Sequence, residues 1–404
     1  MASEHDAEWD SYIATLAPIG RRLLELLPDP DDAYLRQELY QALFGQIASG
    51  YLALWEPDPR YPDFWPFTST GMKPYLNNPD TDYYVTPIDG DGTYQISGFR
   101  GTVHKLDFST GDGTFLSRGN KDDVGIASGL FDIDQDANVG PDGAFEVILS
   151  PTRPQGWTGG WWELPAGSKY LLVRQWTYDW VNEISGRFAI DRLDVPAGRP
   201  PRTIPEIETD LKQIAVWAEG HTQVSIENRR YALGAQGSER INRLETINLG
   251  DYGYFGHLTQ FYVHGGWDLQ PDEAFLIETD VPDGLRYWSI HLANDLCFTL
   301  DWANRHTSVN GHTAVIDDDG KFRVVISAED PGVPNWLDTI SHRTGTISLR
   351  WMGCATPPDS YQFAVVKTAD VRAHLPAATP KVTPEQRDTA IRARRRGVQL
   401  RKRW

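Results

Sequence analysis

The sequence predicts a mainly β protein with added helices (α+β): two jelly-roll-like β-sandwich units, a helical N-terminal region and a helical connector. Segments that alternate apolar and polar residues recur over 80–195 and 272–370, with turn residues between them. Helical spacing of apolar residues is confined to 6–55 and 203–230. Many short strands with frequent turns favour sandwiches over a parallel sheet.

Two stretches of the chain read as the same structural unit written twice. Residues 142–176 and 319–351 each run from an Asp-Gly turn into an apolar strand, then a loop with a tryptophan, then a strand that carries an arginine near its end. The matching pairs are Phe145 with Phe322, Trp161 with Trp336 and Arg174 with Arg350. This correspondence predicts an internal duplication, with a site in either unit or between them.

The expected order of regions follows from these patterns. Helices are predicted at 6–27 and 31–55, while the proline- and aromatic-rich segment 56–67 is expected to be irregular. Residues 231–262 are ambiguous. The expected regions are a helical N-terminal region (1–60), a first β unit (61–200), a helical connector (201–262), a second β unit (263–375), and a linker with a basic tail (376–404).

Charge and composition exclude several classes of function. The formal net charge is −18, and residues 391–404 carry seven basic side chains and no acidic one, so the remaining chain has a net charge of −25. A body this acidic repels nucleic acid and anionic lipid. The basic tail could contact an acidic partner, RNA or the chain's own acidic surface. We favour the alternative of a frayed, solvated helix end.

The chain is expected to be a cytoplasmic protein without a membrane span. No apolar run approaches the length needed to cross a bilayer, and the acidic N-terminus does not read as a signal peptide. Two cysteines, Cys297 and Cys354, are too few for a disulfide framework. Aromatic residues make up 12% of the chain and indicate either large β cores or a ligand pocket lined by rings.

The densest polar cluster lies in the second predicted β unit. Asp338 is a candidate general base or a partner for Arg350, which could clamp an anionic group in two-point fashion. His312 and His342 could transfer protons near neutral pH. The ligand-binding candidates in this unit are Asn310, Asn335, Trp336 and Arg350. In the alternative interpretation, Asp338 and Arg350 form a structural ion pair and the asparagine caps a turn.

The first predicted β unit offers a smaller set of polar residues. Arg174 and Asp179 are ligand-binding candidates, and Asp179 with Glu183 would share one face of a strand. A carboxylate pair suits acid–base hydrolysis. A charged outer face at a strand end gives the same pattern, and we favour that interpretation.

Signatures of metal, nucleotide and nucleophile sites are absent from the sequence. The acidic segment 132–143 resembles a calcium loop at its first ligand positions, but Ala137 and Gly143 occupy places where an EF-hand requires glycine and glutamate. No zinc-binding, phosphate-loop or nucleophile-elbow motif is found. We therefore expect no metal ligand and no cofactor.

A family resemblance rests on three segments, DGKFRVVISAEDPGVPNWLDT, GTISLRW and LPAGSKYLLVRQWTYDWVNE. In these the chain resembles bacterial proteins that carry the domain of unknown function 1214, most clearly over residues 270–355 and more weakly over 80–195. Related proteins pair this domain with a companion, domain 1254, and the resemblance implies two jelly-roll-like β units. Residues 1–200 depart from the full companion pattern. The resemblance implies no reaction.

Three functions remain open. The first is a metal-independent enzyme, or an enzyme-like protein, that acts on a small hydroxylated or aromatic organic molecule. Asn335, His312, Asp338 and Arg350 would then supply orientation, base and anion contact. The second is a non-catalytic module that binds carbohydrate or a hydrophobic metabolite. The third is a structural or assembly protein that forms a homo-oligomer.

Overall fold

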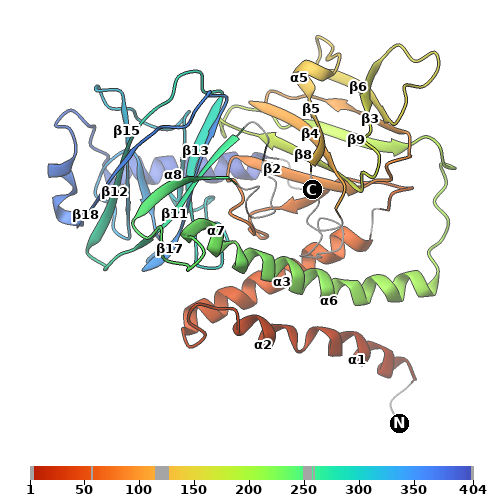
Figure 1. Cartoon of the computed structure of the whole chain (residues 1–404), viewed down its shortest axis with the longest axis horizontal. Helices are drawn as coiled ribbons and strands as arrows, with labels where there is room; N and C mark the ends of the chain where they lie inside the picture. Colours follow the sequence, from red (N-terminus) through yellow and green to blue (C-terminus); the bar gives the residue numbers. More distant parts are fainter. Residues whose placement is uncertain (1–3, 56–57, 114–126, 249–256, 258–259, 402–404) are drawn as a thin grey trace.

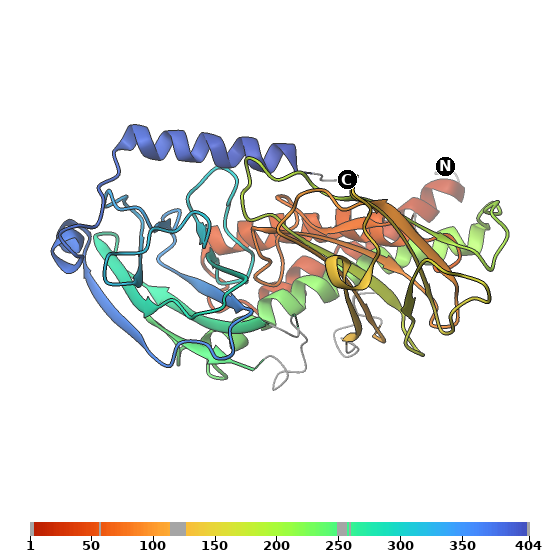
Figure 2. The ribbon, with the colours of Figure 1, turned by 90° about the horizontal axis from the view of Figure 1, so that it is seen from above.

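The computed structural model of the chain describes residues 4–55, 58–113, 127–248, 257 and 260–401. Two β-sandwich units lie side by side, a layer of helices runs along both, and a C-terminal helix lies on another side (Figures 1 and 2). The prediction of a mainly β chain with added helices is therefore confirmed. In the described part of the chain, no helix is long and apolar enough to cross a membrane.

The first unit consists of a five-stranded and a four-stranded sheet. Its strands are β1 (Trp65–Thr68), β2 (Thr81–Pro87), β3 (Tyr94–Phe99), β4 (Lys105–Gly111), β5 (Ala127–Asp132), β6 (Ala144–Ser150), β7 (Gly160–Glu163), β8 (Tyr170–Trp176) and β9 (Arg187–Arg192), with the short helix α5 (Ile133–Asp136) after β5. The sheet orders are β1-β2-β8-β4-β5 and β7-β6-β3-β9. Alternate residues of each strand, such as Leu106 and Phe108, fill the core between the two sheets.

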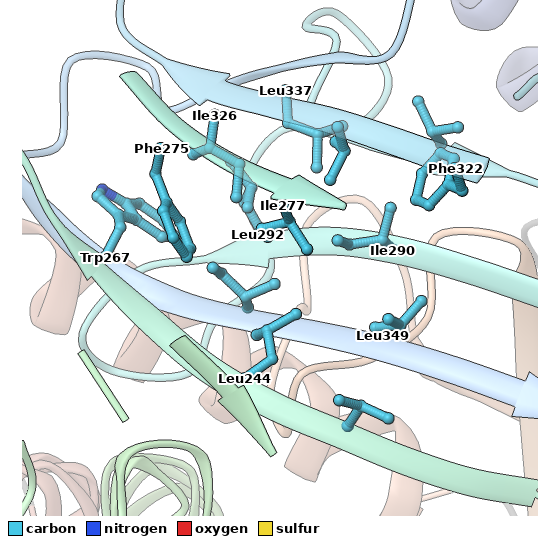
Figure 3. Packing of buried hydrophobic residues seen from close by; sticks show 14 of the residues in the cluster. Leu244, Trp267, Phe275, Ile277, Ile290, Leu292, Phe322, Ile326, Leu337 and Leu349 are labelled. Atoms are coloured by element: carbon cyan, nitrogen blue, oxygen red, sulfur yellow. The ribbon is translucent and has the colours of Figure 1, made fainter. Parts of the chain in front are cut away.

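The second unit has the same arrangement. Its strands are β10 (Arg243–Ile247), β11 (Gln260–Asp268), β12 (Glu273–Asp280), β13 (Tyr287–Ala293), β14 (Ser308–Asn310), β15 (Lys321–Ser327), β16 (Trp336–Asp338), β17 (Thr344–Met352) and β18 (Tyr361–Lys367), followed by the 3₁₀ helix η2 (Thr368–His374). The sheet orders are β10-β11-β17-β13-β14 and β16-β15-β12-β18. Figure 3 shows Phe275 and Ile277 of one sheet packed against Ile290 and Leu349 of the other.

The two units correspond strand for strand. Each strand of the second unit takes the place of the strand nine numbers lower in the first, and in both units one edge pair of the four-stranded sheet is parallel. Local contacts match as well. The indole nitrogens of Trp161 and Trp336 donate to the hydroxyls of Ser150 and Ser327, at 3.1 and 3.0 Å.

The helical layer covers part of the first unit's five-stranded sheet. Its helices are α1 (Glu4–Leu16), α2 (Ile19–Leu24), α3 (Ala33–Trp55), α6 (Ile204–Glu227) and α7 (Arg229–Leu233). Thr203 and Glu206 form a capping box that starts α6. Trp217 of α6 packs beside Gly50 of α3 and joins a cluster with Leu172 on the outer face of the sheet. The remainder of that face is left to meet the second unit.

Helix α8 (Pro384–Leu400) holds the two units together from another side (Figure 2). Its Val398 packs in one cluster with Trp180 of the first unit and Trp302 of the second. Arg394 donates to the carbonyl oxygens of Trp302 and Ser308, and its guanidinium lies 4.5 Å from the Trp180 ring centre. The expectation of a frayed, solvated tail is therefore wrong over this helix, because its basic side chains find partners in both units.

Two further segments differ from expectation. Strand β1 forms at the end of the proline-rich segment that was expected to be irregular, where it pairs with β2. Strands β10 and β11 begin inside the expected connector, and both pair into the second unit's five-stranded sheet. The second unit therefore starts at Arg243. Glycines and prolines obscure the strand pattern in both places.

Candidate functional site

A row of polar side chains crosses the outer face of the first unit's five-stranded sheet. Tyr83 of β2 is opposite Arg174 of β8, which is opposite Asp107 of β4, and Asp107 is opposite Asp132 of β5. Directly paired residues point to the same face of a sheet. These four side chains therefore line up on the face away from the hydrophobic core.

The second unit carries a corresponding row. Tyr262 of β11 is opposite Arg350 of β17, which is opposite Ser289 of β13, and Ser289 is opposite Asn310 of β14. A tyrosine and an arginine thus hold the same two places in both rows. The remaining two places carry carboxylates in the first unit and neutral side chains in the second.

The two outer faces meet at the ends of β8 and β17. Trp176 and Met352, two residues beyond the matching arginines, pack together with Tyr287. His257 bridges the faces, because its Nε2 lies 2.8 Å from an oxygen of Asp107 and its backbone N–H donates to the Tyr262 hydroxyl at 2.8 Å. We call the side chains that meet here the inter-sheet cluster; its members are Lys105, Asp107, Asp132, Arg174, His257, Tyr262, His264, His291, Ser348 and Arg350.

The acidic side of the inter-sheet cluster is built around Asp107. Lys105 lies 2.9 Å from Asp107 and 2.8 Å from Asp132. Burial alone would raise the pKa of Asp107, but the hydrogen bond with His257 and the positive charges of Lys105 and Arg174 outweigh burial and lower it. Burial lowers the pKa of His257, an effect that Asp107 offsets only in part. At neutral pH the carboxylate is therefore ionised and the imidazole is neutral.

Arg174 is buried without a carboxylate partner among the described residues. It is 8% exposed, and its hydrogen bond goes to the Ser109 hydroxyl at 2.9 Å. A guanidinium has five N–H donors in a fork that fits a carboxylate. The charge of Asp107 acts on Arg174 from the neighbouring strand, but no carboxylate of the described residues contacts its unused N–H donors. This combination is typical of a group that awaits an anion.

Arg350 is held in a similar way and is 6% exposed. It donates to Nδ1 of His291 at 3.0 Å and to the Leu76 carbonyl at 2.5 Å, and it lies over the Tyr262 ring. Nε2 of His291 bonds the same carbonyl, at 3.2 Å. All of these partners are neutral, because burial holds the pKa of His291 well below its usual value. No carboxylate of the described residues pairs with Arg350.

Two buried polar atoms of the inter-sheet cluster have no hydrogen-bond partner within the described chain. They are Oδ1 of Asp107 and Nδ1 of His264. His264 contacts the Ser348 hydroxyl at 3.1 Å through its other nitrogen, and burial lowers its pKa to about 3. Buried polar atoms are nearly always paired in folded proteins. These two atoms lie in the same cluster as two arginines that no carboxylate of the described residues contacts. The arrangement therefore points to a bound molecule or water at this place.

Arg174 and Arg350 are linked through the same side chains. Arg174 is opposite Asp107, which contacts His257, and the His257 N–H donates to Tyr262, over whose ring Arg350 lies. The other candidates lie elsewhere. Asp179 and His312 form a second pair at 3.7 Å. Asn310 donates to Asp80, a buried carboxylate at the junction.

The expected grouping of Asn335 and Asp338 with Arg350 is not found. Trp336 and Asp338 lie on the outer face of the second unit's four-stranded sheet, and Leu337 between them points into the core that separates them from Arg350. Asp338 pairs with Arg305 at 2.7 Å, so the structural ion pair with Arg350 is also wrong. The Asn335 amide bonds the backbone of Val315 and Arg323, which is a structural role.

His342 and Trp336 each contact a helix. Nε2 of His342 lies 2.9 Å from Glu38 of α3, and this carboxylate outweighs burial and raises the pKa of the histidine. The Trp336 ring lies under the guanidinium of Arg387 in α8, 5.2 Å away. Both contacts fasten helices to the second unit and are remote from the inter-sheet cluster.

Several members of the inter-sheet cluster were not identified from the sequence. Lys105 and Asp107 alternate with Leu106 and Phe108, and this pattern already predicts two charges on one face of a strand. His291, in a run that reads as a plain apolar strand, gives no such signal. Among the described residues, no group of three or more His, Cys, Asp or Glu side chains is placed to hold a metal ion.

Comparisons with known proteins identify relatives of this chain. The model of the family described as protein of unknown function DUF1214 matches residues 265–356. A crystal structure of an uncharacterized protein from Burkholderia cenocepacia is 30% identical, covers 90% of this chain and 97% of its own, and superposes with a TM-score of 0.79. A protein from Vibrio parahaemolyticus is 13% identical over 82% of this chain and 98% of its own, with a TM-score of 0.46. No curated protein matches the sequence.

Proposed function

The chain belongs to the family of proteins that carry the domain of unknown function 1214, and for this member we propose an enzyme that binds a small organic anion between its two five-stranded sheets and transfers a proton on it. The observation that carries the proposal is Arg174, a buried guanidinium without a carboxylate partner in the described chain, close to Asp107 and His257.

Each residue has a proposed part in binding. Arg174 and Arg350 hold the acidic group of the substrate by charge-assisted hydrogen bonds, which are stronger in a buried setting than in water. The rings of Trp176 and Tyr262 border the inter-sheet cluster, and Trp176 meets His257 edge to face at 5.3 Å. These rings suit an organic molecule with an aromatic or hydroxylated body.

Asp107 and His257 form the proposed proton-transfer pair. The ionised carboxylate orients the imidazole and stabilises the imidazolium that forms when the imidazole takes a proton. Because burial lowers the pKa of His257, the imidazole is neutral and able to accept a proton at neutral pH. Lys105 keeps Asp107 ionised through its positive charge.

The test uses ligand binding and proton exchange, because neither requires the reaction to be known. A panel of small organic acids is screened by thermal shift, and acids that bind are incubated with the enzyme in D₂O while proton NMR follows the loss of C–H signals. Arg174→Gln should weaken binding at least tenfold, since about 1.4 kcal/mol is tenfold in affinity and a charged hydrogen bond contributes about that much or more. Asp107→Asn should bind the acid and exchange protons at least a hundredfold more slowly.

The control is Arg343→Gln, which removes an exposed arginine paired with Asp268 outside the inter-sheet cluster. It should bind and exchange like the unchanged protein. Equal binding by Arg174→Gln and the unchanged protein would contradict the proposed site. Binding without exchange for every acid would instead support a non-catalytic binding module.

Two features of origin and setting are also proposed. The shared strand order of the two units supports an internal duplication. Cys297 and Cys354 are both free thiols, which supports a reducing compartment such as the cytoplasm.

A further inference from the structure

The two arginines of the inter-sheet cluster stand at corresponding positions of the two units. Arg174 lies on β8 and Arg350 on β17, each flanked across one neighbouring strand by a tyrosine, Tyr83 or Tyr262. Each arginine is two residues before Trp176 or Met352, the pair that packs at the meeting point of the sheets. Both guanidinium groups therefore border the region around His257, which contacts Asp107 opposite Arg174 and donates to Tyr262 beneath Arg350.

The charges of the described residues around this region do not balance. Within the inter-sheet cluster the cationic side chains are Lys105, Arg174 and Arg350, and the carboxylates are Asp107 and Asp132, which both contact Lys105. Three positive charges against two negative ones leave one positive charge, and no carboxylate of the described residues contacts either guanidinium group. The imidazoles of His264 and His291 add none near neutral pH, since burial lowers the pKa of both.

We propose that the ligand is a small dicarboxylate, with one carboxylate bound by Arg174 and the other by Arg350. This inference rests on the proposed anion-binding function and narrows its substrate class. A monocarboxylate would leave one of the two buried guanidinium groups without a carboxylate contact, which is unfavourable for a buried charge. A dicarboxylate compensates both and provides acceptors for the N–H donors that the protein leaves unused on each side.

The neighbours of the arginines give the two ends different roles. Around Arg174 lie Asp107 and His257, the proposed proton-transfer pair, so chemistry occurs at the end of the ligand held by the first unit. Around Arg350 lie His291 and Tyr262, which orient the guanidinium without a charge of their own at neutral pH. The second carboxylate therefore serves recognition.

The experiment measures binding by isothermal titration calorimetry with malonate, succinate, malate and phthalate, and with the monomethyl ester of each. The expected result is that one diacid binds at least tenfold more tightly than its half-ester. Arg174→Gln and Arg350→Gln should each remove most of this difference. Far-UV circular dichroism of both variants without ligand should match the unchanged protein, which separates a loss of binding from a loss of folding.

Three outcomes would overturn the inference. A half-ester that binds as tightly as its diacid, while Arg174→Gln still abolishes binding, would refute the dicarboxylate and leave the proposed anion site standing. Inorganic phosphate that binds more tightly than every diacid would indicate a compact dianion on one centre. No binding of any acid to the unchanged protein would contradict both the inference and the proposed function.

Discussion

Tyr287 is the residue whose replacement best tests how the two units are joined. Its hydroxyl donates to the Asp80 carboxylate at 2.6 Å and accepts from the Asn78 amide at 2.7 Å. Asp80 also accepts hydrogen bonds from the indole of Trp180 in the first unit and from the amide of Asn310 in the second unit. This carboxylate therefore has partners in both units. The substitution Tyr287→Phe removes one oxygen and keeps the ring that packs against Trp176.

The expected loss of stability follows from these contacts. A hydrogen bond to a charged group contributes about 1.5–3 kcal/mol and a neutral one about 0.5–1.5 kcal/mol, and the phenylalanine leaves both partners buried. We expect the free energy of unfolding to fall by roughly 2–4 kcal/mol. For one β-sandwich unit this corresponds to a decrease of roughly 5–15 °C in Tm. The control is Tyr361→Phe, which loses only neutral bonds, with the Trp351 indole and the Thr246 side chain, at a partly exposed position, so a smaller loss of about 1 kcal/mol is expected.

The dependence on pH provides a second measure of the same bond. Burial raises the pKa of Asp80, and the hydrogen bond from Tyr287 partly offsets that rise by stabilising the charged form. As the pH falls through this raised pKa, the carboxylate becomes neutral and the bond weakens. The stability difference between Tyr287→Phe and the unchanged protein should therefore shrink as the pH falls through the raised pKa of Asp80 and be largest above it.

Urea unfolding followed by tryptophan fluorescence at several pH values measures both effects. A difference below about 0.5 kcal/mol at neutral pH would refute the reasoning, because it would mean that the bonds to Asp80 and Asn78 contribute nothing net to stability. A difference that does not change with pH would show that the lost bond is not to an ionised carboxylate.

Two further predictions concern helix packing and use matched pairs of variants. Arg394→Ala in α8 should cost about 2–4 kcal/mol in urea unfolding, because its partly buried guanidinium bonds carbonyls of the second unit and stacks on an indole of the first. Arg392 of the same helix is 70% exposed, and Arg392→Ala should cost less than about 0.5 kcal/mol. Gly50→Ala should lower the free energy of unfolding by about 1–3 kcal/mol, measured as a decrease in Tm, since its new Cβ would lie 2.9 Å from the Trp217 ring. Gly20→Ala meets only ordinary contact at 3.4 Å, so the free energy of unfolding should stay the same or rise by up to about 1 kcal/mol. Equal effects within either pair would contradict the packing described here.

The parts of the fold that the sequence predicts are those set by local periodicity. The helix that ends at Trp55 and the strands around Phe145 and Phe322 follow from spacing alone. Strands β10 and β11 were not separated from the connector, because β11 carries two adjacent glycines, Gly265 and Gly266, whose missing side chains weaken the alternating pattern.

The candidate site was harder to predict because it depends on register between distant strands. Arg174 and Arg350 were chosen from their matching places in the sequence, and in the structure both border the region around His257. Asp338 was chosen as a neighbour of Arg350 in the sequence. The two side chains lie on the outer faces of different sheets, Asp338 on the four-stranded and Arg350 on the five-stranded sheet, with the core between them. Only the pairing of β4 with β8 reveals that Asp107 belongs beside Arg174.

The difference between the two polar rows explains why one chain needs both units. In the first unit, Asp107 and Asp132 carry charge beside Arg174. In the second, Ser289 and Asn310 occupy the same places, and Asn310 donates instead to Asp80 and to the Tyr178 carbonyl at the junction. In the proposed function, the row of the second unit serves binding and the contact between the sheets, and the carboxylates suited to proton transfer lie on the first unit. A site assembled in this way exists only while the sheets stay in contact, which ties the proposed activity to the junction around Asp80.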